Sequence, residues 1–159
     1  KLESMGSDLI VVACNTVHHF DKQMESAVTV PLIHMINEAC ADAKRAGYTK
    51  VAIACSQSTK DLGLYSSGLA RIGIEPLVTT ENEQSIVNNA IKDVMAGKQD
   101  DKTKADLNLV FNRFKESGAE AVLLGCTELP LAISQEDSEL TILDANHIVV
   151  KQAIELAIA

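Results

Sequence analysis

The stretch LIVVACNTVHHF (Leu9–Phe20) carries the pattern that decides the fold: an apolar run ends in a cysteine, and small polar residues follow at once. Short apolar runs are typical of buried strands, and residues such as Asn and Thr commonly begin a helix. The same pattern recurs in KVAIACSQST (Lys50–Thr59) and in EAVLLGCTEL (Glu120–Leu129). Three junctions of one kind predict a protein built from repeated strand–helix units.

The apolar periodicity extends this prediction along the chain. The predicted strands are 8–13, 50–55, 74–79, 120–125 and 140–143, and the predicted helices are 15–26, 34–46, 58–72, 81–96, 102–117 and 145–158. Helix ends are marked by glycines suited to C-caps, namely Gly47, Gly73, Gly97 and Gly118. Thr80 and Glu83 have the spacing of a capping box. Strands that alternate with helices indicate an α/β fold with parallel sheets flanked by helices.

The composition and charge of the chain indicate which classes of binding partner are unfavoured. The chain has 159 residues, of which 47% are hydrophobic and 23% charged, and a net charge of −8. This acidic balance, without a Lys/Arg cluster, argues against nucleic acid and anionic membranes as partners. Its apolar runs fall short of the ~20 residues that a membrane span needs. The four cysteines show neither CxxC nor zinc-site spacing, so we expect no metal and reduced thiols, as in the cytoplasm.

The chain begins without an initiator methionine, in KLESMGSD. Leu2 and Met5 resemble the last turn of a helix, and Gly6 resembles its C-cap. We therefore expect the natural protein to extend further at its N-terminus.

Cys14 and Cys126 each stand where a predicted strand ends and a helix begins. A thiol in that position faces free backbone N–H groups and the positive end of a helix dipole, and both favour the thiolate. Two thiols on opposite faces of one carbon, one ionised and one protonated, can remove and return a proton. Asn15, Thr16 and Thr127 add donors suited to a carboxylate. The residues thus predict cofactor-free inversion at a carbon next to a carboxylate.

A single strand-end cysteine has a simpler interpretation, because a free cysteine usually behaves as a small buried apolar side chain. Cys40, in the middle of the predicted helix INEACADA (36–43), fits that interpretation well. The occurrence of two such strand-end cysteines in one fold favours a catalytic role for them.

The segments ACNTVH (Ala13–His18) and GCTELPL (Gly125–Leu131) resemble the two cysteine motifs of the aspartate/glutamate racemase family. VAIACSQSTKDLGLY (Val51–Tyr65) resembles the segment between them, with Cys55-Ser56 where the family usually has Gly-Thr. The resemblance covers nearly the whole chain. It implies two similar lobes, no cofactor, an amino acid as the small-molecule substrate, and a homodimer.

By the same resemblance, Cys14 and Cys126 are the two acid/base thiols. The α-carboxylate of the substrate is held by Asn15, Thr16 and Thr127. Glu128 and His18 also match motif positions, as supporting residues: Glu128 could simply be an acid favoured by a helix N-terminus, and His18 could tune the Cys14 thiol or only pack. Cys55 is interpreted as structural.

The resemblance also predicts how the chain divides. The family begins with a strand and a glycine-rich turn that this sequence does not contain, so the first lobe is expected to be incomplete. Residues 1–31 with 132–159 are the predicted remnant of the first lobe, and residues 32–131 are the predicted second lobe. Val149 stands where members commonly have a histidine, and Met95 stands where some aspartate-specific members have a lysine.

The leading hypothesis is a pyridoxal-independent racemase for aspartate or glutamate. Related chemistries stay open, namely a hydantoin racemase, a maleate isomerase or an arylmalonate decarboxylase. A non-catalytic binding module or a truncated, inactive form is the alternative from another class. The sequence contains neither GxGxxG nor a P-loop, and a thiol-redox enzyme would need a nearby resolving cysteine.

Overall fold

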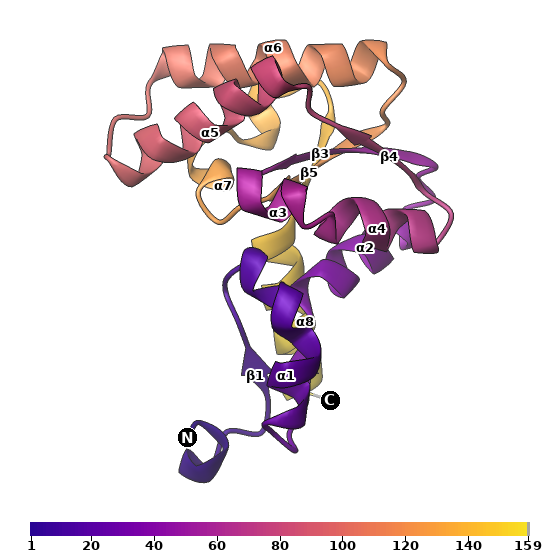
Figure 1. Cartoon of the computed structure of the whole chain (residues 1–159), viewed down its shortest axis with the longest axis vertical. Helices are drawn as coiled ribbons and strands as arrows, with labels where there is room; N and C mark the ends of the chain where they lie inside the picture. The colour runs from indigo at the N-terminus through magenta and orange to yellow at the C-terminus, as the bar shows by residue number, and fades with distance from the viewer. Residues whose placement is uncertain (159) are drawn as a thin grey trace.

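A four-stranded parallel sheet forms the centre of the larger part of the molecule in the computed structural model, which describes residues 1–158 (Figure 1). Its strands are β3 (Lys50–Cys55), β4 (Glu75–Val78), β5 (Ala121–Gly125) and β6 (Thr141–Asp144), in the order β4-β3-β5-β6. The register pairs Cys55 with Gly125 at the carboxyl ends of β3 and β5. Parallel strands place their carboxyl ends at one edge, so the residues that follow β3 and β5 lie close together.

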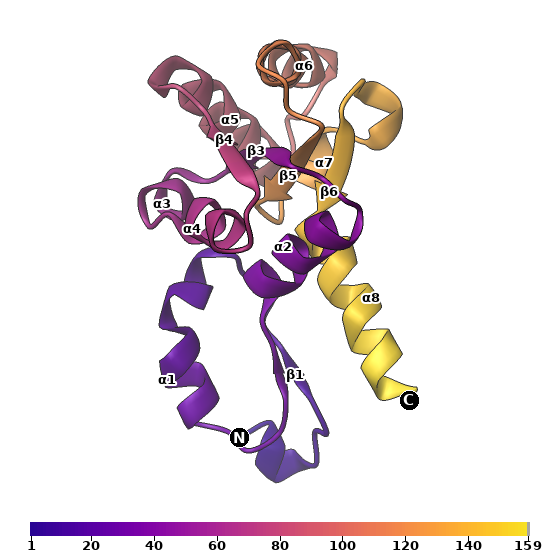
Figure 2. The same ribbon diagram turned by 90° about the vertical axis from the view of Figure 1, so that its right-hand side faces the viewer.

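Helices cover both faces of this sheet (Figure 2). One face packs on α2 (Met35–Arg45), α4 (Leu64–Arg71) and α8 (Ala145–Ala157). The other packs on α5 (Glu81–Met95), α6 (Asp101–Glu116) and the short α7 (Leu129–Ala132). Strands buried on both faces need apolar residues at nearly every position, which is why β3 and β5 read as unbroken apolar runs rather than as alternating patterns.

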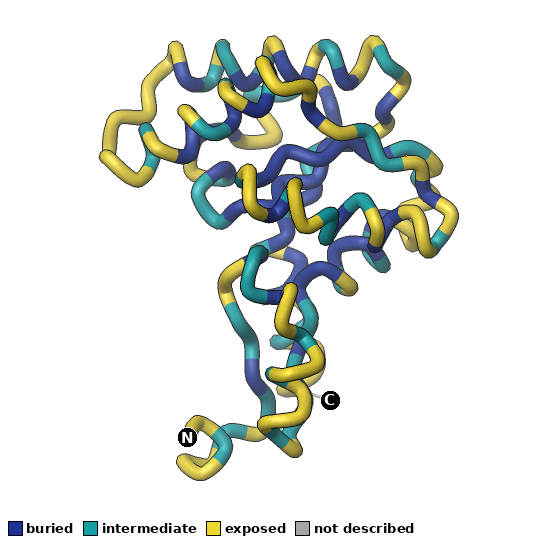
Figure 3. The backbone as a smooth tube through the Cα atoms, in the orientation of Figure 1, coloured by how far each residue is buried: buried dark blue, intermediate teal, exposed yellow. Residues whose placement is uncertain are grey.

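A second, two-stranded sheet stands apart from the first. It pairs β1 (Ile10–Val11) with β2 (Leu32–Ile33) in parallel, and the chain between them forms the 3₁₀ turn η2 (Thr16–Phe20) and α1 (Asp21–Ser26). Figure 1 shows β1, α1 and the end of α8 extending away from the larger sheet. Figure 3 shows that buried residues concentrate around the larger sheet, whereas this extension is mostly exposed or half-buried.

The expected elements are largely confirmed. The strand 50–55 has its expected bounds, and the strands near 74–79, 120–125 and 140–143 lie within a residue or two of them. Gly6, which follows the 3₁₀ turn η1 (Glu3–Met5), has positive φ, as do the four expected C-cap glycines. Thr80 and Glu83 form the predicted capping box.

Several local expectations were wrong. The strand 8–13 shortens to Ile10–Val11, because a partner of only two residues, β2, is available to pair with it. The helix 58–72 is divided into α3 (Gln57–Asp61) and α4, since Gly63 adopts φ 63° between them. The strand β2, the helix α7 and the 3₁₀ turn η3 (Gln135–Asp137) have too few residues to show a period, and were missed.

The predicted lobe boundaries stay a prediction, but two pairings cross them. β6 falls in the range assigned to the first lobe, yet it pairs with β5 in the four-stranded sheet. Its Leu143 and Ile142 pack into the clusters on opposite faces of that sheet, which is the physical reason for its position. β2 falls in the range of the second lobe, yet it pairs with β1. Over residues 1–158, no helix has the length and apolar character that crossing a bilayer requires.

We predict that Phe114→Ala lowers the free energy of unfolding by about 3–5 kcal/mol, because this fully buried ring in α6 would leave a cavity in the core. Leu109→Ala, on the same helix but 65% exposed, is the matched control and should change stability by less than about 0.5 kcal/mol. Urea unfolding followed by circular dichroism measures both. Equal losses in the two variants would contradict the assigned core.

Candidate active site

Cys14 lies in the loop between β1 and η2, and its side chain is exposed. The loop is held by His18, whose Nδ1 lies 2.8 Å from the carbonyl oxygen of Cys14. The other ring nitrogen, Nε2, accepts a hydrogen bond from the backbone N–H of Met35 at 3.2 Å. An accepting Nε2 requires the proton to be on Nδ1, so His18 donates to Cys14 and is neutral.

In this geometry His18 holds two backbone segments together and has no free ring nitrogen for proton transfer. It is 2% exposed, and burial lowers the pKa of its imidazole. Both ring nitrogens are occupied, one by the Cys14 loop and one by the start of α2. The side chain thereby ties the backbone of Cys14 to the start of α2, which packs on the larger sheet.

The residues after Cys14 are tied to the segment that follows β3. Asn15 is 4% exposed, and its Oδ1 accepts a hydrogen bond from the Tyr65 hydroxyl. The hydroxyl oxygen of Thr16 lies 2.7 Å from that of Thr59, which in turn lies 3.1 Å from the hydroxyl of Ser56. The Cys14 loop thus lies against α3 and α4 at the carboxyl edge of the sheet.

Cys126 follows β5 directly and is 9% exposed. Its thiol donates to Oε2 of Glu128 at 3.0 Å, and the Thr127 hydroxyl donates to the same oxygen at 2.8 Å. Asn146, in the first turn of α8, lies with its Nδ2 3.4 Å from the Thr127 carbonyl oxygen. A carboxylate that accepts from two neighbours is well stabilised, and the pKa of Glu128 is lowered, chiefly by the Cys126 hydrogen bond.

A strand-end position was expected to favour a thiolate, but the surroundings of Cys126 favour the protonated thiol. Burial, together with the hydrogen bond to Glu128, raises the pKa of its thiol to about 12. The helix that follows, α7, spans only Leu129–Ala132, so it supplies too few aligned peptides for a strong dipole. The negative charge of the Glu128 carboxylate, which accepts from the thiol, outweighs the weak positive charge at the N-terminus of α7. Cys126 therefore stays protonated at neutral pH.

Tyr65 links the two cysteine segments. Its hydroxyl donates to Asn15, next to Cys14, and its ring lies against Gly125, next to Cys126. The contact is close enough that a Cβ added to Gly125 would lie 2.5 Å from Cε2 of the ring. One aromatic side chain therefore contacts the neighbours of both predicted catalytic cysteines. The sequence had offered Tyr65 only as part of a matching pattern, and Thr59 likewise.

The remaining cysteines lie in the core. Burial raises the pKa of Cys55 to about 12 and that of Cys40 to about 11. The Cys55 carbonyl accepts from the buried Gln84 amide at 2.8 Å, which anchors α5 to the end of β3. Among residues 1–158, no three His, Cys, Asp or Glu side chains gather as a metal-binding group.

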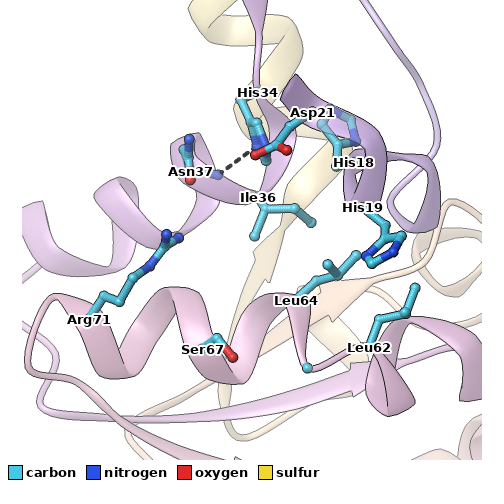
Figure 4. Close-up of a pocket in the computed structure, with 11 residues that line it drawn as sticks. His18, His19, Asp21, His34, Ile36, Asn37, Leu62, Leu64, Ser67 and Arg71 are labelled. Atoms are coloured by element: carbon cyan, nitrogen blue, oxygen red, sulfur yellow. Dashed lines mark hydrogen bonds and ion pairs between the residues drawn. The ribbon is translucent and has the colours of Figure 1, made fainter. Parts of the chain in front are cut away.

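A cavity of about 250 Å³ lies beside His18, between η2, α1, the start of α2 and α4 (Figure 4). Nε2 of His34 lies 3.4 Å from Oδ2 of Asp21 at one side of it, and Arg71 lies at another. Neither Cys14 nor Cys126 is among the lining residues, so this cavity is separate from the predicted site of proton transfer.

The sequence model of the family described as Asp/Glu/Hydantoin racemase matches residues 1–153. This chain belongs to that family. The α/β fold with parallel sheets flanked by helices is the fold of its structural neighbours. Of the relatives below, two are named as amino-acid racemases, which are isomerases, and one as an aspartate racemase homologue.

Three relatives of this racemase-family chain illustrate the similarity. A crystal structure of an aspartate racemase homologue from Pyrococcus horikoshii OT3 is 32% identical, with a TM-score of 0.89 over 99% of this chain and 70% of that one. The Picrophilus torridus aspartate racemase is 26% identical, with a TM-score of 0.80, covering 96% of this chain and 64% of that one. The broad specificity amino-acid racemase RacX of Bacillus subtilis is 23% identical over 159 residues, which are 69% of its length. The chain thus spans about two thirds of each.

We predict that iodoacetamide labels Cys14 at least about 100-fold faster than the other three thiols of this family member, because alkylation requires an accessible thiolate. Glu128→Gln should shift the pH profile of Cys126 labelling to lower pH, since it removes the negative charge beside the thiol. Peptide mass spectrometry after timed quenching measures each site. Glu139→Gln, at an exposed carboxylate paired with Lys115, is the control. Labelling of Cys126 as fast as that of Cys14 would refute the assigned environments.

His18 should make folding pH-dependent. Its pKa is lowered in the fold, so the unfolded chain binds the proton more tightly, and stability is lost as pH falls through the unfolded value of about 6.5. We predict that His18→Asn, which keeps a donor for the Cys14 carbonyl but cannot titrate, reduces the loss of unfolding free energy between about pH 7.5 and about pH 5. His147→Asn, at an exposed histidine, should leave that loss unchanged. The same slope in all three proteins would argue against a buried neutral His18.

Proposed function

We propose that the protein is a pyridoxal-independent racemase that interconverts the L and D forms of aspartate or glutamate by proton transfer between two cysteines. Family membership supports the reaction class. The observation that carries the mechanism is the contrast between the two thiols: Cys14 is exposed, and Cys126 is buried and held protonated by Glu128. A racemase of this kind needs one thiol in each protonation state before each turnover.

In one direction, the thiolate of Cys14 removes the α-proton, and the electron pair of the C–H bond stays on the α-carbon beside the carboxylate. The Cys126 thiol then gives its proton to the opposite face. Cys14 ends as a thiol and Cys126 as a thiolate, and the reverse reaction restores both. The Glu128 carboxylate makes the Cys126 thiolate costly, so it favours the return of a proton to this sulfur.

The α-carboxylate of the substrate would be held by Asn15, Thr16 and Thr127. The net charge of −8 repels an acidic amino acid, so binding depends on these local donors rather than on long-range attraction. Thr16 and Thr127 hydroxyls engage Thr59 and Glu128 in the free protein, and rotation about χ1 would turn them to a ligand. A homodimer is part of this proposal, on the strength of the family resemblance alone.

We predict that Cys14→Ser and Cys126→Ser each lower kcat by at least about 10³, because a serine hydroxyl is too weak an acid to exchange the α-proton. The assay follows optical rotation and deuterium uptake at the α-carbon in D₂O, with L- and D-aspartate and glutamate as substrates. Cys40→Ala removes a thiol from the middle of α2 and is the control.

Unchanged deuterium uptake in either serine variant would refute the two-cysteine mechanism. Turnover of a hydantoin, of maleate or of an arylmalonate, without turnover of free amino acids, would instead assign the alternative chemistry.

A further inference from the structure

Tyr65 occupies a position that the proposed mechanism does not use directly. It is one of two tyrosines in the chain, lies on α4 and is 1% exposed. Its hydroxyl donates to Oδ1 of Asn15, and the edge of its ring contacts Gly125. It therefore reaches a predicted carboxylate-binding residue on one side and the neighbour of Cys126 on the other.

The direction of this hydrogen bond fixes the orientation of the Asn15 amide. The Tyr65 hydroxyl lies against Oδ1 of Asn15, which can only accept, and burial raises the pKa of Tyr65 well above its usual value, so the hydroxyl keeps the proton that it donates. Asn15 must then present its oxygen to Tyr65 and turn its NH₂ group the other way.

The Asn15 NH₂ group is available to a ligand. Its Nδ2 makes no hydrogen bond within residues 1–158, as the side-chain bonds there show. In the same residues every fully enclosed side-chain nitrogen or oxygen has a partner. Nδ2 is therefore not fully enclosed, although Asn15 as a whole is only 4% exposed. A donor that is oriented, largely dry and unengaged suits a carboxylate.

We propose that Tyr65 is a positioning residue for the racemisation: by holding Oδ1 of Asn15, it directs the amide NH₂ at the α-carboxylate of the amino-acid substrate. This inference rests on the proposed function and adds a residue to it. Tyr65 does not touch the reacting atoms; it acts through Asn15. Gly125 contributes to this positioning because it has no side chain: a Cβ there would displace the Tyr65 ring.

The test compares Tyr65→Phe with Tyr48→Phe, which removes the only other tyrosine hydroxyl, from a half-buried ring outside the site. Tyr65→Phe should raise KM for aspartate or glutamate about tenfold and change kcat by less than about threefold, because the lost orientation weakens substrate and transition state alike. Tyr48→Phe should leave both constants unchanged. A KM within about twofold of the wild-type value in Tyr65→Phe would overturn the inference.

Gly125→Ala supplies an independent perturbation. It should displace the same ring and raise KM, and the double variant with Tyr65→Phe should show much less than the sum of the two effects in free energy. Additive effects would indicate that Gly125 and Tyr65 act separately, against the inference.

A second readout does not depend on turnover. The side-chain amide resonances of Asn15 in ¹H–¹⁵N spectra should move in Tyr65→Phe and stay in place in Tyr48→Phe. If they do not move in Tyr65→Phe, the inference fails whether or not the protein racemises amino acids. If they move but the wild-type protein shows no racemisation and no α-proton exchange, the proposed function fails and the positioning role for this reaction fails with it.

Discussion

A buried tyrosine hydroxyl that donates to Asn15, with its ring laid against Gly125, is the contact on which the arrangement of both cysteine segments depends. The two segments are far apart in sequence and belong to different sheets. Cys14 follows β1 of the small sheet, and Cys126 follows β5 of the large one. Tyr65 contacts both segments. His18 further holds the Cys14 segment in place by hydrogen bonds to the Cys14 carbonyl and to the backbone at the start of α2. These contacts matter to the proposed mechanism, because proton transfer between two cysteines would require accurate placement of both sulfurs.

The two thiols differ because their surroundings differ, although their sequence contexts are alike. Exposure leaves Cys14 in contact with water, whereas Cys126 is enclosed and donates to a carboxylate. Desolvation and a neighbouring negative charge both disfavour a thiolate, and together they exceed what the four-residue helix α7 offers in return. The proposed acid/base pair of identical side chains needs such an asymmetry, and the position of Glu128 beside Cys126 would supply it.

Much of the fold was predictable because the core strands are covered on both faces. Residues 50–55 could be assigned to a strand with accurate bounds, since a short, unbroken apolar run is typical of a strand that is buried on both faces. Glycine C-caps and the Thr80–Glu83 capping box were predictable because they depend on local backbone geometry alone. β2 and the break at Gly63 were not predictable, because two paired residues or one left-handed residue carry no periodic signal.

The sequence by itself determined the class of fold, the order of its elements and the identity of the residues at the ends of its strands. It also determined the resemblance that led to the racemase family, because motif residues are read directly from the chain. Only the tertiary structure decided that the Cys126 thiol is protonated, that His18 is neutral and bonded through both ring nitrogens, and that Tyr65 joins the two segments. Those properties depend on burial and on hydrogen bonds between residues distant in the chain, and such contacts exist only after the sheets and helices have packed.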